Sequence, residues 1–354
     1  MLGEHAKSHK LSVVLCTYAP RPDLLARALR AISRQTLHPD AFELVIVDNN
    51  SPQPLRTDVC EHLAMRDVQI IRELRQGLTY ARVAGINATR EPVICFVDDD
   101  NELAPDYLEN VLRIAAKEDE LGAWGGICEG AFETRVGRLQ HPWLPHLGVR
   151  YAGPHPLTGP GDAWGEHEPI GAGICVRRHV AEGYVAFVES EGAAGALGRK
   201  GKALLSGEDS LISRTAHRLG YTVGYRPVLK LNHHITAPRL KLRYLARLME
   251  GHGRSYITLQ HISGNPLPGI DPATSRRELW NNFRHRLKTD GLNKAVGMYY
   301  WDKGYQAAIR DLSDTETVDQ IMPALERAGL RRPTDPSTPV SAPHQAIETA
   351  SHRS

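Results

Sequence analysis

The segment Val93-Ile94-Cys95-Phe96-Val97-Asp98-Asp99-Asp100 places three consecutive carboxylates directly after a short apolar run. An apolar run of this length predicts a buried strand. Three like charges repel one another, so a strand that ends in them indicates a cation nearby. A hard divalent cation with oxygen ligands that bridges to substrate phosphates would suit this position, because parallel sheets bind ligands beyond the carboxyl ends of their strands. A solvated acidic turn before the next helix explains the triplet equally well at this point.

Three similar apolar runs precede this segment, and helical patterns separate several of them. Together the four runs predict strands at residues 11–16, 43–47, 68–71 and 93–97. Helical spacing of apolar residues follows Pro22, recurs at 79–89 and recurs again from Pro105 to Ala116. Strands that alternate with helices indicate an α/β fold with a mostly parallel sheet flanked by helices.

The remaining chain divides by composition. Residues 136–170 are rich in Pro, Gly and Trp, and a loop this long is typical of a functional lid. Strand character returns at 170–176, helices are expected at 206–219 and from 240 to about 260, and 275–330 is amphipathic. From Pro333 onward the composition is that of a disordered tail.

The bulk composition excludes several classes of protein. The net charge is +2 and aromatic residues are 6% of the chain, which argues against a nucleic-acid-binding protein. The five cysteines are scattered without a Cys-x-x-Cys pair, which suits reduced thiols in a cytosol. The first ten residues lack an apolar signal core, and no apolar run reaches the ~18 residues of a membrane span. We therefore expect a soluble, cytoplasmic protein.

Two further acidic positions and a histidine pair are candidates for chemistry. Asp48 directly follows the second strand, although Asp-Asn-Asn-Ser is also a typical turn sequence. Asp209 with Glu208 opens a helix, and Ser206 with Asp209 has capping-box spacing, which explains the acids without catalysis. The alternative is that one of them takes a proton from an attacking hydroxyl. His233 beside His234 is a candidate metal ligand, or an ordinary solvated or core histidine.

The order of these segments resembles family-two glycosyltransferases with the GT-A fold. The residues that carry the resemblance are Val13–Tyr18, Val45–Ser51, Gln76–Arg82, Phe96–Asp100, Gly171–Gly173 and Gly207–Ser210, over about residues 10 to 260. Thr17-Tyr18-Ala19-Pro20 stands where a dinucleotide-binding fold would carry a Gly-rich loop. The resemblance implies a flexible stretch at 1–10 and a GT-A domain at 11–239. Within it, a nucleotide-sugar half at 11–127 precedes an acceptor half at 128–239, followed by a helical region at 240–332 and the tail at 333–354.

The resemblance also implies roles for individual residues. Asp209, with Glu208, is expected to be the catalytic base, and Trp164, Gly171, Ala172 and Gly173 are expected to bind the acceptor. A Mn²⁺ or Mg²⁺ ion is expected on Asp100, with Asp98 and His233. The remaining contacts to a nucleoside-diphosphate sugar are expected from Thr17, Tyr18, Asp48, Arg82, Asp98 and Asp99. One departure is Val83 after Arg82, where many relatives carry Asn.

The implied reaction is metal-assisted single displacement, in which an acceptor hydroxyl receives the sugar with inversion. The acceptor is a glycan, a lipid-linked glycan or a small molecule, and a homodimer is left open. A sugar-phosphate nucleotidyltransferase and a non-catalytic nucleotide-sugar-binding subunit are the alternatives. The helix from Leu240 has basic and apolar residues, so it either packs on the catalytic domain or touches the inner membrane face. Packing is the favoured interpretation.

Overall fold

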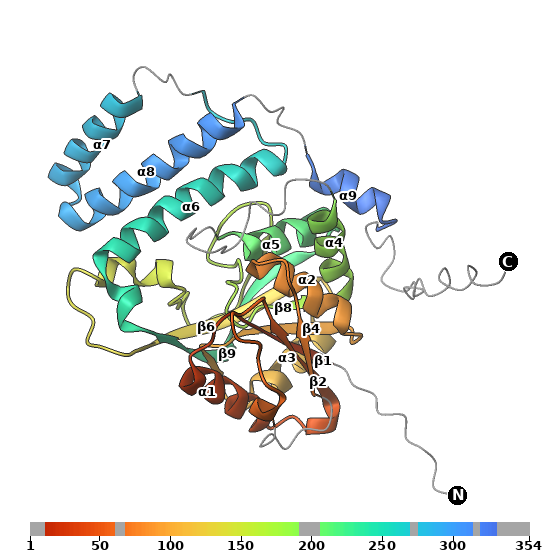
Figure 1. The fold of residues 1–354 in the computed structure, drawn as a ribbon. Coiled ribbons are helices and arrows are strands. Elements are labelled where there is room, and N and C mark those ends of the chain that lie inside the picture. Colours follow the sequence, from red (N-terminus) through yellow and green to blue (C-terminus); the bar gives the residue numbers. More distant parts are fainter. Residues whose placement is uncertain (1–10, 61–67, 191–205, 270–274, 314–318, 331–354) are drawn as a thin grey trace, which may run out of the picture.

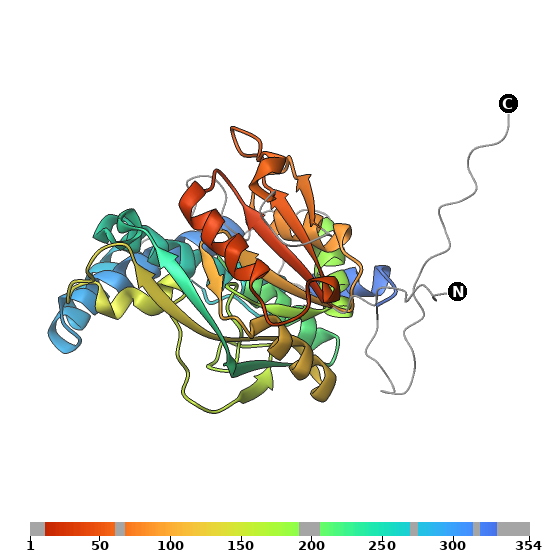
Figure 2. The ribbon, with the colours of Figure 1, turned by 90° about the horizontal axis from the view of Figure 1, so that it is seen from below.

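The computed structural model describes residues 11–60, 68–190, 206–269, 275–313 and 319–330. The expectations for residues 1–10 and 333–354 concern parts of the chain outside these ranges. Among the described residues, one sheet runs through the molecule in the order β3-β2-β1-β4-β8-β6-β9-β5, with β7 paired to β9. Figures 1 and 2 show helices on both faces of this sheet and a helical layer above one end.

The N-terminal part of the sheet is parallel, as the alternating pattern predicts. Its strands are β1 (Leu11–Thr17), β2 (Phe42–Asp48), β3 (Val68–Arg72) and β4 (Val93–Asp98). β1 pairs in parallel with both β2 and β4, and β2 pairs in parallel with β3. The predicted α/β class is therefore confirmed, with the purely parallel pairing confined to this part.

The rest of the sheet is mixed, and the sequence patterns predicted one of its five strands, at residues 170–176. These strands are β5 (Asn101–Leu103), β6 (Leu121–Phe132), β7 (Leu157–Pro160), β8 (Cys175–Arg177) and β9 (Thr222–Ile235). β8 is antiparallel to β4 and β6, whereas β6 and β9 are parallel. β8 is shorter than the strand expected at 170–176, because residues 171–173 form a bend and a turn. The expected boundary between the nucleotide-sugar half and the acceptor half, after residue 127, falls inside β6.

β6 lacked a strand signal because four of its residues are glycines. At Gly126 an added Cβ would lie 2.0 Å from the carbonyl oxygen of Leu229, so the two strands approach too closely for a side chain. A β-branched pattern is impossible where the neighbouring backbone occupies that space.

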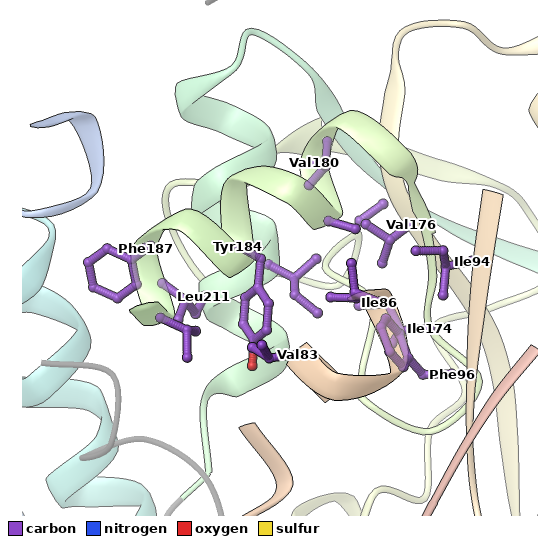
Figure 3. Packing of buried hydrophobic residues seen from close by; sticks show 14 of the residues in the cluster. Val83, Ile86, Ile94, Phe96, Ile174, Val176, Val180, Tyr184, Phe187 and Leu211 are labelled. Carbon is purple, nitrogen blue, oxygen red and sulfur yellow. The ribbon is translucent and has the colours of Figure 1, made fainter. Parts of the chain in front are cut away.

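Two hydrophobic clusters cover the two faces of the sheet, and β1 contributes to both. Val14 and Cys16 point into the cluster beneath α2 (Leu78–Ala88), α4 (Arg178–Glu189) and α5 (Glu208–Arg218). Val13 and Leu15 point into the cluster beneath α1 (Pro22–Ser33) and α3 (Tyr107–Lys117). Figure 3 shows the first cluster between α4 and the sheet. Each such buried side chain contributes about 1.5–3 kcal/mol, so a strand buried on both faces fixes its carboxyl end firmly.

The helical region consists of α6 (Leu242–Ile262), α7 (Ser275–Thr289), α8 (Leu292–Leu312) and α9 (Ile321–Arg327). α6 lies along α8, and α7 lies on the outer side of α8 (Figure 1). An added Cβ at Gly304 would lie 1.9 Å from the carbonyl oxygen of Glu250, so glycine permits the close packing of α6 on α8. Leu245, Leu248 and Met249 of α6 are buried in a cluster with Trp143, which agrees with the favoured interpretation that α6 packs on the domain. No helix in the described part of the chain is long and apolar enough to cross a bilayer.

Candidate active site

The carboxyl ends of β1, β2 and β4 meet at one edge of the sheet. Thr17 at the end of β1 is in register with Asp48, and Cys16 is in register with Asp98. Beyond this edge lies a cavity of about 760 Å³. Its walls include, from the predicted set, Thr17, Tyr18, Arg82, Asp98, Asp99, Asp100, Trp164, Gly171, Ala172, Glu208, Asp209 and His233. Asp48 and Gly173 are the two predicted residues that do not line it.

Asp48 faces a turn rather than the cavity. Its two carboxylate oxygens accept hydrogen bonds from the backbone N–H groups of Ser51 (3.0 Å) and Leu55 (3.1 Å). Burial alone would raise the pKa of Asp48, but these hydrogen bonds and Arg72 lower it overall. The neighbouring Asn49 lines the cavity instead. Asp48 thus shapes the loop, and a direct contact with a nucleotide base stays a prediction.

Asp100 and His233 converge on one cationic group. The Nη1 atom of Arg239 donates to Oδ2 of Asp100 at 2.8 Å and lies 3.0 Å from Nε2 of His233. Asp100 Oδ2 and His233 Nε2 are themselves 3.3 Å apart. The antiparallel pairing of β5 with β9, in which Asn101 lies opposite His233, produces this proximity. A guanidinium can only donate, so this contact suits the tautomer with a lone pair on Nε2, which is also the tautomer that a metal ligand at Nε2 requires.

A divalent cation therefore fits between Asp100 and His233 only in part. An oxygen and a nitrogen lone pair already point at a positive charge there, which is the donor chemistry that Mn²⁺ accepts. Within the described residues, however, no three His, Cys, Asp or Glu side chains form a ready metal site. Such a cation would take the place of the Arg239 guanidinium and would need further oxygens from its ligand, as Mg²⁺ commonly takes from substrate phosphates.

Asp99 turns back toward β1. Its carboxylate accepts a hydrogen bond from the hydroxyl of Thr17. Burial, with Asp100 and Asp98 close by, raises the pKa of Asp99 to about 7. Two of the three consecutive carboxyl groups thus have different surroundings: Asp100 faces Arg239, and Asp99 is held by Thr17.

Asp209 is fixed at the start of α5 with its carboxylate on the cavity wall. Oδ2 accepts from the backbone N–H of Gly171 at 2.9 Å, and Oδ1 accepts from the N–H of Ser210 at 2.8 Å. An added Cβ at Gly171 would lie 2.8 Å from a guanidinium nitrogen of Arg82, so a side chain there would displace the end of Arg82. Gly171 therefore positions Asp209.

The capping-box interpretation of Ser206 and Asp209 is wrong. The residue before α5 is Gly207, with φ of 106°, and no side chain caps the helix. The hydroxyl of Ser206 lies 2.8 Å from Nδ1 of His252 on α6 instead. Asp209 still benefits from the helix dipole, but its second oxygen is used to reach Gly171 across the cavity wall.

Arg82 is a buried cation beside these acids, with only 1% of its surface exposed. Its Nη1 lies 3.9 Å from Glu208, and its Nη2 donates to the carbonyl of Gly171 at 3.4 Å. Burial would lower the pKa of Arg82, but Glu208 and Asp98 outweigh it and raise the pKa. Its Nε and Nη1 have no hydrogen-bond partner among the described residues. Arg82 can therefore donate to an anionic ligand.

The C-terminal helices complete the cavity, which sequence reasoning did not foresee. Trp301 of α8 and His252 of α6 line it together with Trp164 from the 136–170 loop. The indole of Trp164 donates to the hydroxyl of Ser210 at 2.6 Å, beside Asp209. The Trp164 ring lies edge-on to Tyr256 at 5.6 Å and to Trp301 at 6.2 Å. An aromatic wall thus stands next to the Asp209 carboxylate.

Glu168 is a second cavity carboxyl that sequence reasoning missed. Burial and the nearby Asp209 raise its pKa to about 8, against the opposing influence of Arg214. The folded protein therefore binds this proton more tightly than the unfolded chain does, whose pKa is about 4.3. The protonated carboxyl of Glu168 therefore favours the folded state. This contribution to the free energy of unfolding is fully present below pH ~4.3 and is lost as the pH rises toward ~8.

We expect Glu168→Gln to remove this loss of folding stability at high pH, because an amide stays neutral. Urea unfolding at pH 5, 7 and 9 should show a free-energy difference between variant and wild type that moves in favour of the variant as pH rises. Glu129→Gln, at an exposed position on β6, is the control and should show no such trend. A difference for Glu168→Gln that is the same at all three pH values would contradict the assignment.

Comparisons with known proteins agree with this fold. The family model described as glycosyl transferase family 2 matches residues 12–184. A succinoglycan biosynthesis protein of Rhizobium meliloti is 31% identical over 134 residues, which are 36% of this chain and 41% of that protein. The glucosyl-dolichyl phosphate glucuronosyltransferase of Haloferax volcanii is 24% identical over 242 residues, 67% of this chain and 72% of that protein.

Among solved structures, a mannosyltransferase of Pyrobaculum calidifontis in complex with GDP-Man and Mn²⁺ superposes with a TM-score of 0.51. The sequence identity is 14%, and the match covers 92% of this chain and 81% of that one. The match to the Rhizobium protein spans less than half of that protein's length. The strand order and these matches lead to one conclusion: residues 12–184 match glycosyl transferase family 2, and the chain has the GT-A fold.

Proposed function

We propose that the protein transfers a sugar from a nucleoside-diphosphate sugar to an acceptor hydroxyl, with inversion at the anomeric carbon. The observation that carries the proposal is that one cavity brings together Asp98 to Asp100, the buried cation Arg82 and the carboxylate of Asp209. The acids at the strand ends suit a donor, and Asp209 lies beside an aromatic wall that suits an acceptor.

In the proposed reaction Asp209 accepts the proton of the acceptor hydroxyl. The acceptor oxygen forms a bond to the anomeric carbon while the bond from that carbon to the phosphate oxygen breaks on the opposite face. The nucleoside diphosphate leaves with the bonding electron pair. The backbone N–H of Gly171 fixes the orientation of Asp209 (2.9 Å), and a correctly placed base of this kind accelerates transfer by about 10²–10⁴-fold.

The donor side of the cavity contains cations that can balance the negative charge of a diphosphate. Arg82 and Arg239 can donate to phosphate oxygens, and Thr17, Tyr18 and Asn49 surround the nucleotide end. A Mn²⁺ or Mg²⁺ ion held by Asp100 and His233, near Asp98, would neutralise charge on the leaving group. The complex of the Pyrobaculum enzyme with GDP-Man and Mn²⁺ supports a donor and cation of these classes. Arg239 would then move from Asp100 to the diphosphate.

The acceptor side suits a glycan. Sugar rings present apolar C–H faces that pack on aromatic rings, and Trp164 is 41% exposed on the cavity wall beside Trp301. The succinoglycan protein among the relatives supports polysaccharide or glycoconjugate synthesis. Cytoplasmic location and a homodimer remain predictions.

We expect Trp301→Ala to raise the KM for a soluble glycan acceptor about 10-fold, because loss of an aromatic contact costs about 0.5–1.5 kcal/mol. The Kd of the donor should stay near wild type, and Trp301→Phe should restore much of the acceptor affinity. Initial rates at varied acceptor concentration measure this. Trp280→Ala, on α7 and outside the cavity lining, is the control. An unchanged acceptor KM in Trp301→Ala would exclude this wall from acceptor binding.

The proposal is tested by the products. Thermal-shift screening of sugar nucleotides with Mn²⁺ or Mg²⁺ identifies the donor, and incubation with acceptors should then release nucleoside diphosphate. A nucleotidyltransferase would instead transfer the nucleotidyl group of a nucleoside triphosphate to a sugar phosphate and release pyrophosphate. A non-catalytic subunit would bind the donor without turnover of any kind.

A further inference from the structure

The outermost helix, α7, combines cations with exposed apolar side chains on one face. Its sequence from Ser275 to Thr289 contains five Arg or Lys residues and one acid, Glu278. Trp280 is 55% exposed and Leu287 is 42% exposed. These two lie seven positions apart and therefore on the same side of the helix. Four exposed cations flank them on that face: Arg276, Arg277 and Arg284 lie one turn away, and Lys288 follows Leu287.

The inward face of α7 is what holds the helix in place. Arg286 forms an ion pair with Asp302 of α8 at 2.5 Å. Phe283 stacks on Trp280 at 5.5 Å and lies edge-on to Tyr299 of α8 at 5.8 Å. The fifth cation of α7 is thus used for internal packing, and the other four are directed elsewhere.

Figure 1 shows α7 on the far side of α8 from α6 and the sheet. Leu292, the first residue of α8, is also exposed (59%). The face of α7 with Trp280 and Leu287 is remote from the cavity, none of whose walls comes from α7.

We propose that this face of α7 docks the protein on an anionic lipid surface. Trp280 and Leu287 would enter the boundary between headgroups and acyl chains, while the four cations would contact lipid phosphates. Charge complementarity selects this occupant, because four cations surround the two apolar residues and the acid of α7, Glu278, lies on another side. Basic helices with Trp and Leu at the centre of the apolar face bind membranes in this way.

The proposal moves membrane contact from α6 to α7. The helix from Leu240 was the candidate on sequence, but Leu245, Leu248 and Met249 are buried inside the protein. α7 has a weaker helical pattern because its apolar residues are few, which is why sequence reasoning did not select it.

Sedimentation with vesicles tests the proposal. The full-length protein should co-sediment with phosphatidylcholine vesicles containing 30% phosphatidylglycerol, and at least ~10-fold less with pure phosphatidylcholine vesicles. Raising the salt from 50 to 500 mM should weaken the binding, since screening shortens the reach of the charges. The fluorescence of Trp280 should shift to the blue on binding, and Trp280→Phe should remove that shift.

Two variants separate the contributions. Arg276→Glu with Arg284→Glu should reduce binding to anionic vesicles at least ~10-fold, and Trp280→Ala with Leu287→Ala should reduce it at all salt concentrations. Arg27→Glu with Arg30→Glu makes the same charge change on exposed positions of α1 and should leave most of the binding.

Equal losses of vesicle binding in the α1 and α7 charge variants would overturn the proposal, because they would indicate a general effect of net charge. Binding to neutral vesicles, or dimer formation through α7 without vesicle binding, would also overturn it. The donor-binding cavity is not involved, so the result is independent of the proposed reaction.

Discussion

Asp209→Asn should lose at least ~10³-fold in the rate of sugar transfer while binding the donor nucleotide with near wild-type affinity. Asparagine keeps the size of the side chain and can still accept from the N–H of Gly171, which lies 2.9 Å from Oδ2 in the wild type. It cannot take a proton from the acceptor hydroxyl. Transfer rates under saturating donor, together with calorimetric titration of the nucleoside diphosphate, measure the two effects separately.

A matched control distinguishes catalysis from a role at the start of a helix. Asp106 stands directly before α3, makes no side-chain cap and is exposed. Asp106→Asn removes a carboxylate from the same kind of position and should keep full activity. If Asp209→Asn were as active as Asp106→Asn, Asp209 would return to the role of a helix-terminal acid.

Asp100→Ala should abolish the dependence of nucleoside-diphosphate binding on Mn²⁺. In the wild type we expect Mn²⁺ to tighten the nucleotide at least ~10-fold, equivalent to about 1.4 kcal/mol, because the ion would join Asp100 to the diphosphate. Without Asp100 the ion loses the ligand that Arg239 contacts at 2.8 Å in this structure. Calorimetric titration of the nucleotide with and without Mn²⁺ measures the difference without requiring turnover.

Glu102→Ala is the control for that experiment. Glu102 lies two residues further on β5 and pairs with His234 at 2.8 Å rather than with the candidate cation position. Its removal should leave the Mn²⁺ dependence intact. Undiminished Mn²⁺ stimulation in Asp100→Ala would place the ion, if it binds, on other ligands.

The sequence predicted the strands and acidic positions whose local residue pattern also marks the candidate site. The apolar runs that end at Asp48 and Asp98 predicted parallel strands, and the register of β1 with β2 and β4 confirms that these ends meet. Asp209 was recognisable only through its motif, since capping explained it equally well from the residues alone. The structure excludes the capping box, because no side chain caps α5, and the catalytic role of Asp209 stays a prediction.

The parts that sequence reasoning missed depend on long-range packing. β6 is rich in glycine because the backbone of Leu229 occupies the side-chain space at Gly126, so its strand signal is lost. Trp301 and His252 reach the cavity because α6 and α8 fold back over it, and nothing in their local sequence indicates this. Arg239 contacts Asp100 across 139 positions. Glu168 gives no local signal, since its character arises from burial beside Asp209.

The most direct test of the account is the anomeric configuration of the first product formed. Once the donor and an acceptor are known, proton NMR of the reaction mixture reports the configuration at the transferred sugar before any mutarotation. Single displacement with Asp209 as base predicts complete inversion, with one nucleoside diphosphate released for each glycosidic bond formed. Retention of configuration, or release of pyrophosphate in place of nucleoside diphosphate, would contradict it.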